Sequence, residues 1–112
     1  MRFNSKKAIY LQIADFICEN ILLENWKIGE RIPSVREFAV NIEVNPNTVM
    51  RTYSFLQDQD IIFNKRGIGY FISEDAFEKT LKLKKDEFIS QDLPEFIKKM
   101  KLLNIAPKDI FS

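Results

Sequence analysis

The sequence predicts a mainly α-helical protein with one small β-hairpin and a helical C-terminal tail. Three observations support this fold class. Apolar residues recur at intervals of three and four along most of the chain, which is the spacing of amphipathic helices. Two helix-start signatures, at Ser34 and at Asn45-Pro46, lie close together near the middle of the sequence. After Asp60 the pattern changes to two runs of β-branched and aromatic residues, which is typical of strands.

The first helix is expected from residue 8 to about residue 24, because its apolar residues fall on one side of a helix. That side consists of Ile9, Ile13, Phe16, Ile17 and Ile21. Cys18 lies within the same pattern, so we expect it to serve packing. A turn that ends at Gly29 then leads to Arg31-Ile32, which we expect to form a very short strand.

Two short helices are predicted between residues 33 and 59, with very little chain between them. The Ser34 hydroxyl can accept a hydrogen bond from the Glu37 amide while the Glu37 side chain reaches back, which is a capping box. The helix that it starts should end near Ile42. The next helix should start at Asn45-Pro46, because Asn is a favoured N-cap and proline at the first helical position forfeits an amide without a partner.

The helix from residue 46 to about residue 59 is expected to have one apolar and one polar side. The apolar side consists of Val49, Tyr53 and Leu56. At about 100° per residue, the opposite side consists of Asn47, Arg51 and Ser54. Thr48 lies on the flank near the N-terminal end. The outer side therefore combines amide, hydroxyl and guanidinium groups.

A β-hairpin with a basic tip is predicted next. Residues 61–63 and 69–72 are the strand-like runs, and Lys65, Arg66 and Gly67 lie between them. Both strands are short, so we expect the hairpin to depend on the helices for its stability.

Residues 73–112 predict a helical tail. Ser73 can cap a helix that continues to about Ser90, and Asp92-Leu93-Pro94-Glu95 has the pattern of a second capping box. Because so little chain separates these helices, we expect a two-helix hairpin whose apolar sides form a dimer interface. The expected dimerisation residues are Phe77, Leu81, Phe88, Phe96, Ile97 and Met100. A ligand pocket lined by the phenylalanines is the alternative.

Composition excludes several kinds of site. The 112 residues include no His and one Cys, so neither a Cys/His metal site nor an internal disulfide is expected. We expect no cofactor and no enzyme, since His-based acid–base chemistry, paired carboxylates in a cleft and a nucleophile motif are all missing from the pattern. No apolar stretch is long enough to span a bilayer and no signal peptide is apparent, so we expect a cytoplasmic protein without a membrane partner. Since the formal charge is only +1, any polyanion site must be a local patch.

The order helix, short helix, break, helix and basic-tipped hairpin is that of a winged helix-turn-helix. The helix starting at Pro46 has the size to lie in a DNA major groove, where its N-terminal residues would meet base edges. Asn prefers adenine there and Arg prefers guanine. Lys65 and Arg66 at the tip would add positive charge beside a flanking backbone or minor groove. Double-stranded DNA is therefore the expected partner.

Four segments, "IYLQIADFI", "GERIPSVREFA", "VNPNTVMRTYSFL" and "KRGIGYFI", closely resemble in order and spacing the DNA-binding domain of the GntR transcription regulators. The tail is too short for the large effector domains of many such regulators and resembles the paired-helix dimerisation tail of the small YtrA-like subfamily. The resemblance implies a DNA-binding domain at residues 1–72 and a dimerisation tail at residues 73–112. It also implies a homodimer, more often repressor than activator, on a near-palindromic operator, in some cases beside transporter genes. Whether a small-molecule effector exists stays open.

The resemblance also assigns DNA contacts. Arg36 corresponds to the Arg of the "PSxRE" element, and Arg51 to the Arg of "NTVxR". The expected DNA-binding residues are Ser34, Arg36, Asn45, Asn47, Thr48, Arg51, Lys65, Arg66 and Gly67. Four of them have a structural alternative: Ser34 and Asn45 can be caps, Arg36 can pair with Glu37 or Glu30, and Arg51 can be a solvated charge or pair with a neighbouring acid.

Two positions depart from the family pattern. Glu43 and Asp60 stand where glycine is usual, so a left-handed backbone at either would cost about 1 kcal/mol or less. As an alternative function, a winged helix can also serve as a protein–protein interaction module, which the near-neutral charge permits. Salt dependence of DNA binding separates the two functions.

Overall fold

The computed structural model describes residues 1–4 and 6–111. The chain divides into two compact units, and the boundary between them falls inside a helix. The first unit, Met1–Leu81, contains α1 (Ile9–Leu22), α2 (Val35–Ile42), α3 (Pro46–Asp58), β1 (Ile62–Lys65) and β2 (Gly69–Ile72). The helix α4 (Ala76–Glu87) begins in the first unit and ends in the second. The second unit continues with the π-helix η1 (Phe88–Asp92), α5 (Leu93–Leu102) and the 3-10 helix η2 (Pro107–Asp109). The mainly helical fold with one small hairpin is therefore confirmed.

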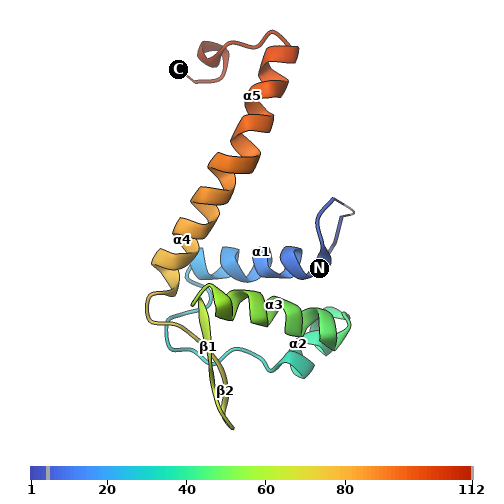
Figure 1. The fold of residues 1–112 in the computed structure, drawn as a ribbon, viewed down its shortest axis with the longest axis vertical. Helices are drawn as coiled ribbons and strands as arrows, with labels where there is room; N and C mark the ends of the chain where they lie inside the picture. Colours follow the sequence, from blue (N-terminus) through green and yellow to red (C-terminus); the bar gives the residue numbers. More distant parts are fainter. Residues whose placement is uncertain (5, 112) are drawn as a thin grey trace. The chain divides into compact units, whose positions relative to one another are not determined.

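The core of the first unit lies between α1 and α3, which run side by side in Figure 1. The side chains that are 0% exposed there include Ile13, Ile17, Val49, Tyr53 and Leu56. Burial of a large apolar side chain contributes about 1.5–3 kcal/mol, so this contact is a main source of stability. Cys18 is buried in the same place, as expected. The predicted apolar side of α1 is wrong at Ile9 and Phe16, which are 45% and 38% exposed.

A residue with a left-handed backbone conformation follows each of α2 and α3. Glu43 has φ 56° and Asp60 has φ 59°, so both positions where glycine was expected do adopt a positive φ. At Glu43 the chain leaves α2 and turns into the Asn45 cap of α3. The predicted backbone strain is therefore confirmed. It lies in the turn between α2 and α3 at Glu43, and just after α3 at Asp60.

The hairpin is anchored to the helices by a third short segment. Strands β1 and β2 are antiparallel, with Ile62 opposite Ile72 and Lys65 opposite Gly69. Arg31 forms an isolated bridge with Phe71, which confirms the very short strand expected there. Gly29 N–H donates to Ile72 O at 2.9 Å, and Ile32 N–H donates to Tyr70 O at 3.0 Å. The wing is therefore fixed at its base and extends away from α1 and α3 (Figure 1).

The tail differs from expectation at its middle. We expected the chain to reverse direction at Asp92-Leu93-Pro94-Glu95, but α4, η1 and α5 follow one another without a non-helical residue. Asp92 is itself helical (φ −74°, ψ −44°) and its side chain makes no capping hydrogen bond. The predicted capping box therefore does not form. The wider π turn ends at Asp92, two residues before Pro94, whose ring would clash with the fourth preceding carbonyl in a regular α-helix. The two predicted helices are present, joined by a π turn where we expected a hairpin loop.

Candidate nucleic-acid interface

The expected DNA-binding residues all lie in the first unit, in three places. They are Ser34 and Arg36 at the start of α2, Asn45, Asn47, Thr48 and Arg51 at the start of α3, and Lys65, Arg66 and Gly67 at the wing tip. Ser34 and Thr48 are half-buried and the others are exposed. The structure therefore leaves these polar groups accessible on the first unit.

The start of α3 is capped as expected. The Asn45 side-chain oxygen accepts from the Asn47 amide at 2.8 Å, and Pro46 occupies the first turn. This bond uses the oxygen of the Asn45 amide and leaves its NH₂ donors free. The Thr48 and Val49 amides both donate to Asn45 O, at 3.0 and 3.2 Å, so a nearby phosphate would be favoured here by the positive end of the helix dipole.

The outer side of α3 is polar and uncovered, apart from one apolar side chain. Asn47, Arg51 and Ser54 are exposed, opposite the buried Val49 and its neighbours. Met50 is also exposed, by 44%, and was not among the expected contacts. Its helical position, three residues after Asn47, was sufficient to find it. An apolar side chain here can contact a thymine methyl group in the major groove.

Arg51 does not extend freely into solvent. Its Cζ lies 4.0 Å from the centroid of the Tyr10 ring, in the first turn of α1. Because these residues are far apart in sequence, no local pattern could have paired them.

The start of α2 is held by the predicted capping box. The Glu37 amide donates to Ser34 Oγ at 3.1 Å, and the Ser34 amide donates to Glu37 Oε1 at 3.1 Å. The bonds from the Ser34 backbone and hydroxyl, followed by the positive charge of Arg31, lower the pKa of the Glu37 carboxyl. Glu37 is thus engaged by Ser34, and Glu30 accepts from the Lys27 amide at 3.0 Å. Both acids proposed as partners for Arg36 therefore bond elsewhere.

Three aromatic rings connect α2, α3 and the wing. Tyr53 of α3 lies 6.2 Å from Phe38 of α2 and 5.0 Å edge-on from Tyr70 of β2, between ring centroids. The Tyr53 hydroxyl donates to Pro33 O at 2.7 Å. Burial, followed by the nearby Tyr70 and Glu37, raises the pKa of Tyr53, so it keeps the proton that it donates. This cluster holds the three candidate DNA-binding elements in a fixed arrangement.

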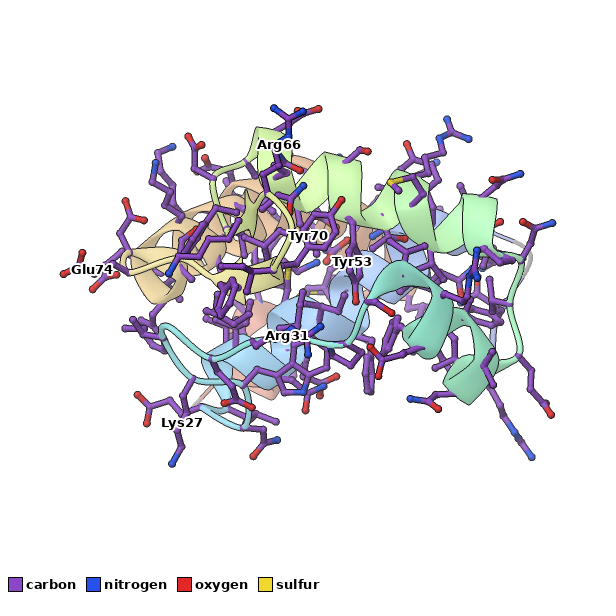
Figure 2. All side chains as sticks on the ribbon, turned by 90° about the horizontal axis from the view of Figure 1, so that it is seen from below. Lys27, Arg31, Tyr53, Arg66, Tyr70 and Glu74 are labelled. Carbon is purple, nitrogen blue, oxygen red and sulfur yellow. The ribbon has the colours of Figure 1, made fainter. Side chains whose placement is uncertain are left out.

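The wing tip is exposed and positively charged. Lys65 Nζ lies 5.1 Å from the centroid of the Phe71 ring, while Arg66 lies at the outer edge of Figure 2. Gly67 has φ 79°, a left-handed conformation that favours glycine in a tight turn. These contacts orient the Lys65 side chain without covering it.

Arg31 is a further exposed cation that sequence reasoning did not select. A Cβ added to Gly69 would lie 2.9 Å from Arg31 Nε, so the arginine side chain crosses directly over the wing backbone. Figure 2 shows Arg31 on the same side of the molecule as Tyr53 and Tyr70. Its position two residues before the "PSxRE" element was the available signal.

The expected dimerisation residues divide between the two units. Phe77 and Leu81 are half-buried in the first unit, where Phe77 lines a cavity of about 340 Å³ together with Trp26 and Ile72. In the second unit, Phe88, Phe96 and Ile97 are 52%, 44% and 42% exposed. Met100 is 8% exposed and is covered mainly by its own chain. Phe96 and Ile97 are therefore better placed than Met100 to contact a partner.

Residues 1–4 and 6–111 contain no group of three or more His, Cys, Asp or Glu side chains that could hold a metal ion. Within the same residues, no helix is long and apolar enough to cross a membrane.

Known proteins share both this sequence pattern and this fold. Residues 9–72 match the family described as "Bacterial regulatory proteins, gntR family". The HTH-type transcriptional regulator YhcF of Bacillus subtilis (strain 168) is 39% identical over 97% of this chain and 88% of that protein. The HTH-type transcriptional repressor YtrA of the same organism is 41% identical over 83% of this chain and 71% of that protein. A crystal structure titled as a putative GntR-family transcriptional regulator from Bacteroides thetaiotaomicron is 48% identical, covers 92% of this chain and 89% of that chain, and has a TM-score of 0.75.

Proposed function

Because this chain belongs to the GntR family of bacterial regulatory proteins, we propose that it binds a specific operator as a homodimer and represses transcription. The supporting observation is the uncovered polar side of α3, in the same unit as the exposed basic wing tip. A helix with such a side can enter the major groove while the wing contacts the neighbouring backbone.

The proposed contacts follow from the chemistry of each side chain. Asn47 suits adenine and Arg51 suits guanine, because each can form a bidentate pair at the base edge. Thr48, Ser34 and the free amide of Asn45 can donate to phosphate or base. Arg36 at the start of α2 would bind the phosphate backbone.

The wing would contribute mainly to affinity. Lys65 and Arg66 are exposed cations beside Gly67, so they can approach a phosphate backbone without reading the sequence. Contacts of this kind release counterions and make the binding constant fall steeply with salt.

A homodimer is proposed through the tail, with residues 1–72 serving DNA binding and residues 73–112 serving dimerisation. Exposed Phe88, Phe96 and Ile97 provide the apolar surface for a second copy. Two recognition helices would then lie about 34 Å apart, one turn of DNA. Doubling the basic groups on one surface also offsets the weak net charge of +1.

Repression is the proposed outcome, because a dimer on an operator would exclude RNA polymerase. The relative YtrA is itself named as a repressor. We propose the cytoplasm as the location, and a transporter operon as one candidate target.

Selection of genomic DNA fragments on the purified protein tests this proposal. We expect enrichment of a near-palindromic site, with an affinity for the selected site that falls steeply between low and high salt. Absence of any enriched site, together with no salt-dependent DNA binding, would instead indicate a protein–protein interaction module.

A further inference from the structure

Tyr10 makes two separate contacts with the recognition helix. Its ring lies under the Arg51 guanidinium, with 4.0 Å between Cζ and the ring centroid. Its carbonyl oxygen accepts a hydrogen bond from Thr52 Oγ1 at 2.7 Å. The first contact involves a side chain on the outer side of α3. The second joins a buried side chain of α3 to the backbone of α1.

The carbonyl contact fixes where the ring can be. Thr52 is 0% exposed, so its bond to Tyr10 O lies within the packed contact of the two helices. The position of the Tyr10 backbone therefore does not depend on the ring. Replacement of the ring can remove the contact with Arg51 while the helix–helix contact stays in place.

The ring contact restricts a side chain that is otherwise flexible. A free arginine side chain has many rotamers, and ordering them on binding reduces affinity. A ring within about 6 Å of a guanidinium attracts it through the electrons of the aromatic face. The N–H groups of arginine radiate in the guanidinium plane. A ring centred 4.0 Å from Cζ can pack on the guanidinium face and leave its edge free for guanine O6 and N7.

We propose that Tyr10 is a positioning residue for base readout, whose ring holds the Arg51 guanidinium ready to bind guanine. This inference rests on the proposed DNA-binding function. It differs from that proposal in assigning a role in sequence preference to α1, outside the helix-turn-helix and the wing. A ring that instead held Arg51 away from DNA would have the opposite effect on affinity.

The test compares two variants of Tyr10 in the full-length protein. Tyr10→Phe keeps the aromatic face, whereas Tyr10→Leu keeps an apolar side chain without it. We expect Tyr10→Phe to bind the selected operator within about twofold of the unmodified protein. We expect Tyr10→Leu to bind it about three- to fivefold more weakly, since a cation–π contact at an exposed site has about this effect. Binding to a scrambled duplex should be unchanged in both variants.

A double variant that combines Tyr10→Leu with Arg51→Ala distinguishes positioning of Arg51 by the ring from a general structural effect of losing the ring. If the ring acts through Arg51, adding Tyr10→Leu to Arg51→Ala should weaken operator binding no further. A full additional loss in the double variant would overturn the inference. So would operator binding by Tyr10→Leu that equals or exceeds that of the unmodified protein.

A measurement without DNA keeps this test independent of the proposed function. The Nε–H proton signal of Arg51 should be shifted by the ring current in the unmodified protein and in Tyr10→Phe, and should lose that shift in Tyr10→Leu. Absence of the shift in the unmodified protein would overturn the inference even if DNA binds. Failure of the unmodified protein to bind any DNA would instead remove the proposed function, and with it the role of Tyr10 in readout.

Discussion

The two compact units use their apolar side chains in opposite ways. In the first unit, large residues such as Ile17, Val49 and Leu56 are 0% exposed. Among residues 82–111 of the second unit, Met100 alone is buried, while Phe88, Ile89 and Phe96 stay substantially exposed. The first unit has its own core, and the second has an apolar surface without one. The difference indicates that the first unit can hold its fold by itself, whereas the tail has an apolar surface that the proposed second copy would cover.

The largest predicted effect tests the core of the first unit. Leu56→Ala should lower the free energy of unfolding by about 2–5 kcal/mol, because it leaves a cavity beside α1. Ser54→Ala, on the exposed side of the same helix, should change it by less than about 0.5 kcal/mol. Urea unfolding followed by circular dichroism measures both. Equal losses in the two variants would contradict the assignment of a packed core to this side of α3.

The next largest effect tests the surface of the second unit. Phe96→Glu would place a carboxylate in the proposed dimer interface, so we expect it to weaken dimerisation by about 3 kcal/mol. Lys98→Glu, on another side of α5, should leave the dimer intact. Sedimentation equilibrium measures the two dissociation constants. A Phe96→Glu protein that dimerises normally would exclude this side of α5 from the interface.

A smaller effect tests the separate roles proposed within the first unit, base readout by α3 and backbone contact by the wing. Arg51→Ala should cost about 1–3 kcal/mol of operator binding and relax base preference at one position of each half-site. Lys65→Ala should weaken specific and scrambled DNA alike and make the salt dependence shallower. Gel-shift titrations at several salt concentrations distinguish these outcomes. Unchanged operator affinity in Arg51→Ala would remove Arg51 from base readout.

The smallest predicted effect is a gain in stability. Glu43 has φ 56°, so Glu43→Gly should raise the free energy of unfolding by about 1 kcal/mol by relieving strain. Glu43→Gln removes the charge without changing the backbone preference and should leave stability unchanged. Thermal unfolding of both variants checks this. Equal stabilisation by Gln and Gly would assign the effect to charge instead.

Sequence reasoning succeeded where the determining interaction is local. The capping box of Ser34 and Glu37 and the Asn45-Pro46 start involve neighbouring residues, so their patterns placed the starts of α2 and α3 correctly. The positive φ at Glu43 and Asp60 was likewise anticipated, because glycine is usual there. The exposed side of α3 followed from the helical period.

Sequence reasoning failed where a local signal competes with another or where contacts are distant. Asp92 has the pattern of an N-cap, but the chain stays helical there and continues through a π turn into α5. The contacts of Arg51 with Tyr10 and of Arg31 with Gly69 join segments far apart in the chain. Such pairs depend on how the helices and the wing pack together, which no short pattern encodes.

Protection of guanine N7 from dimethyl sulfate on the selected operator tests the central claim most directly. A dimer that inserts the polar side of α3 should protect two groups of guanines in the major groove, about one helical turn apart on one face. Arg51→Ala should lose protection at one guanine in each group. Tight, sequence-specific binding that leaves every guanine N7 reactive would contradict the insertion of α3 into the major groove.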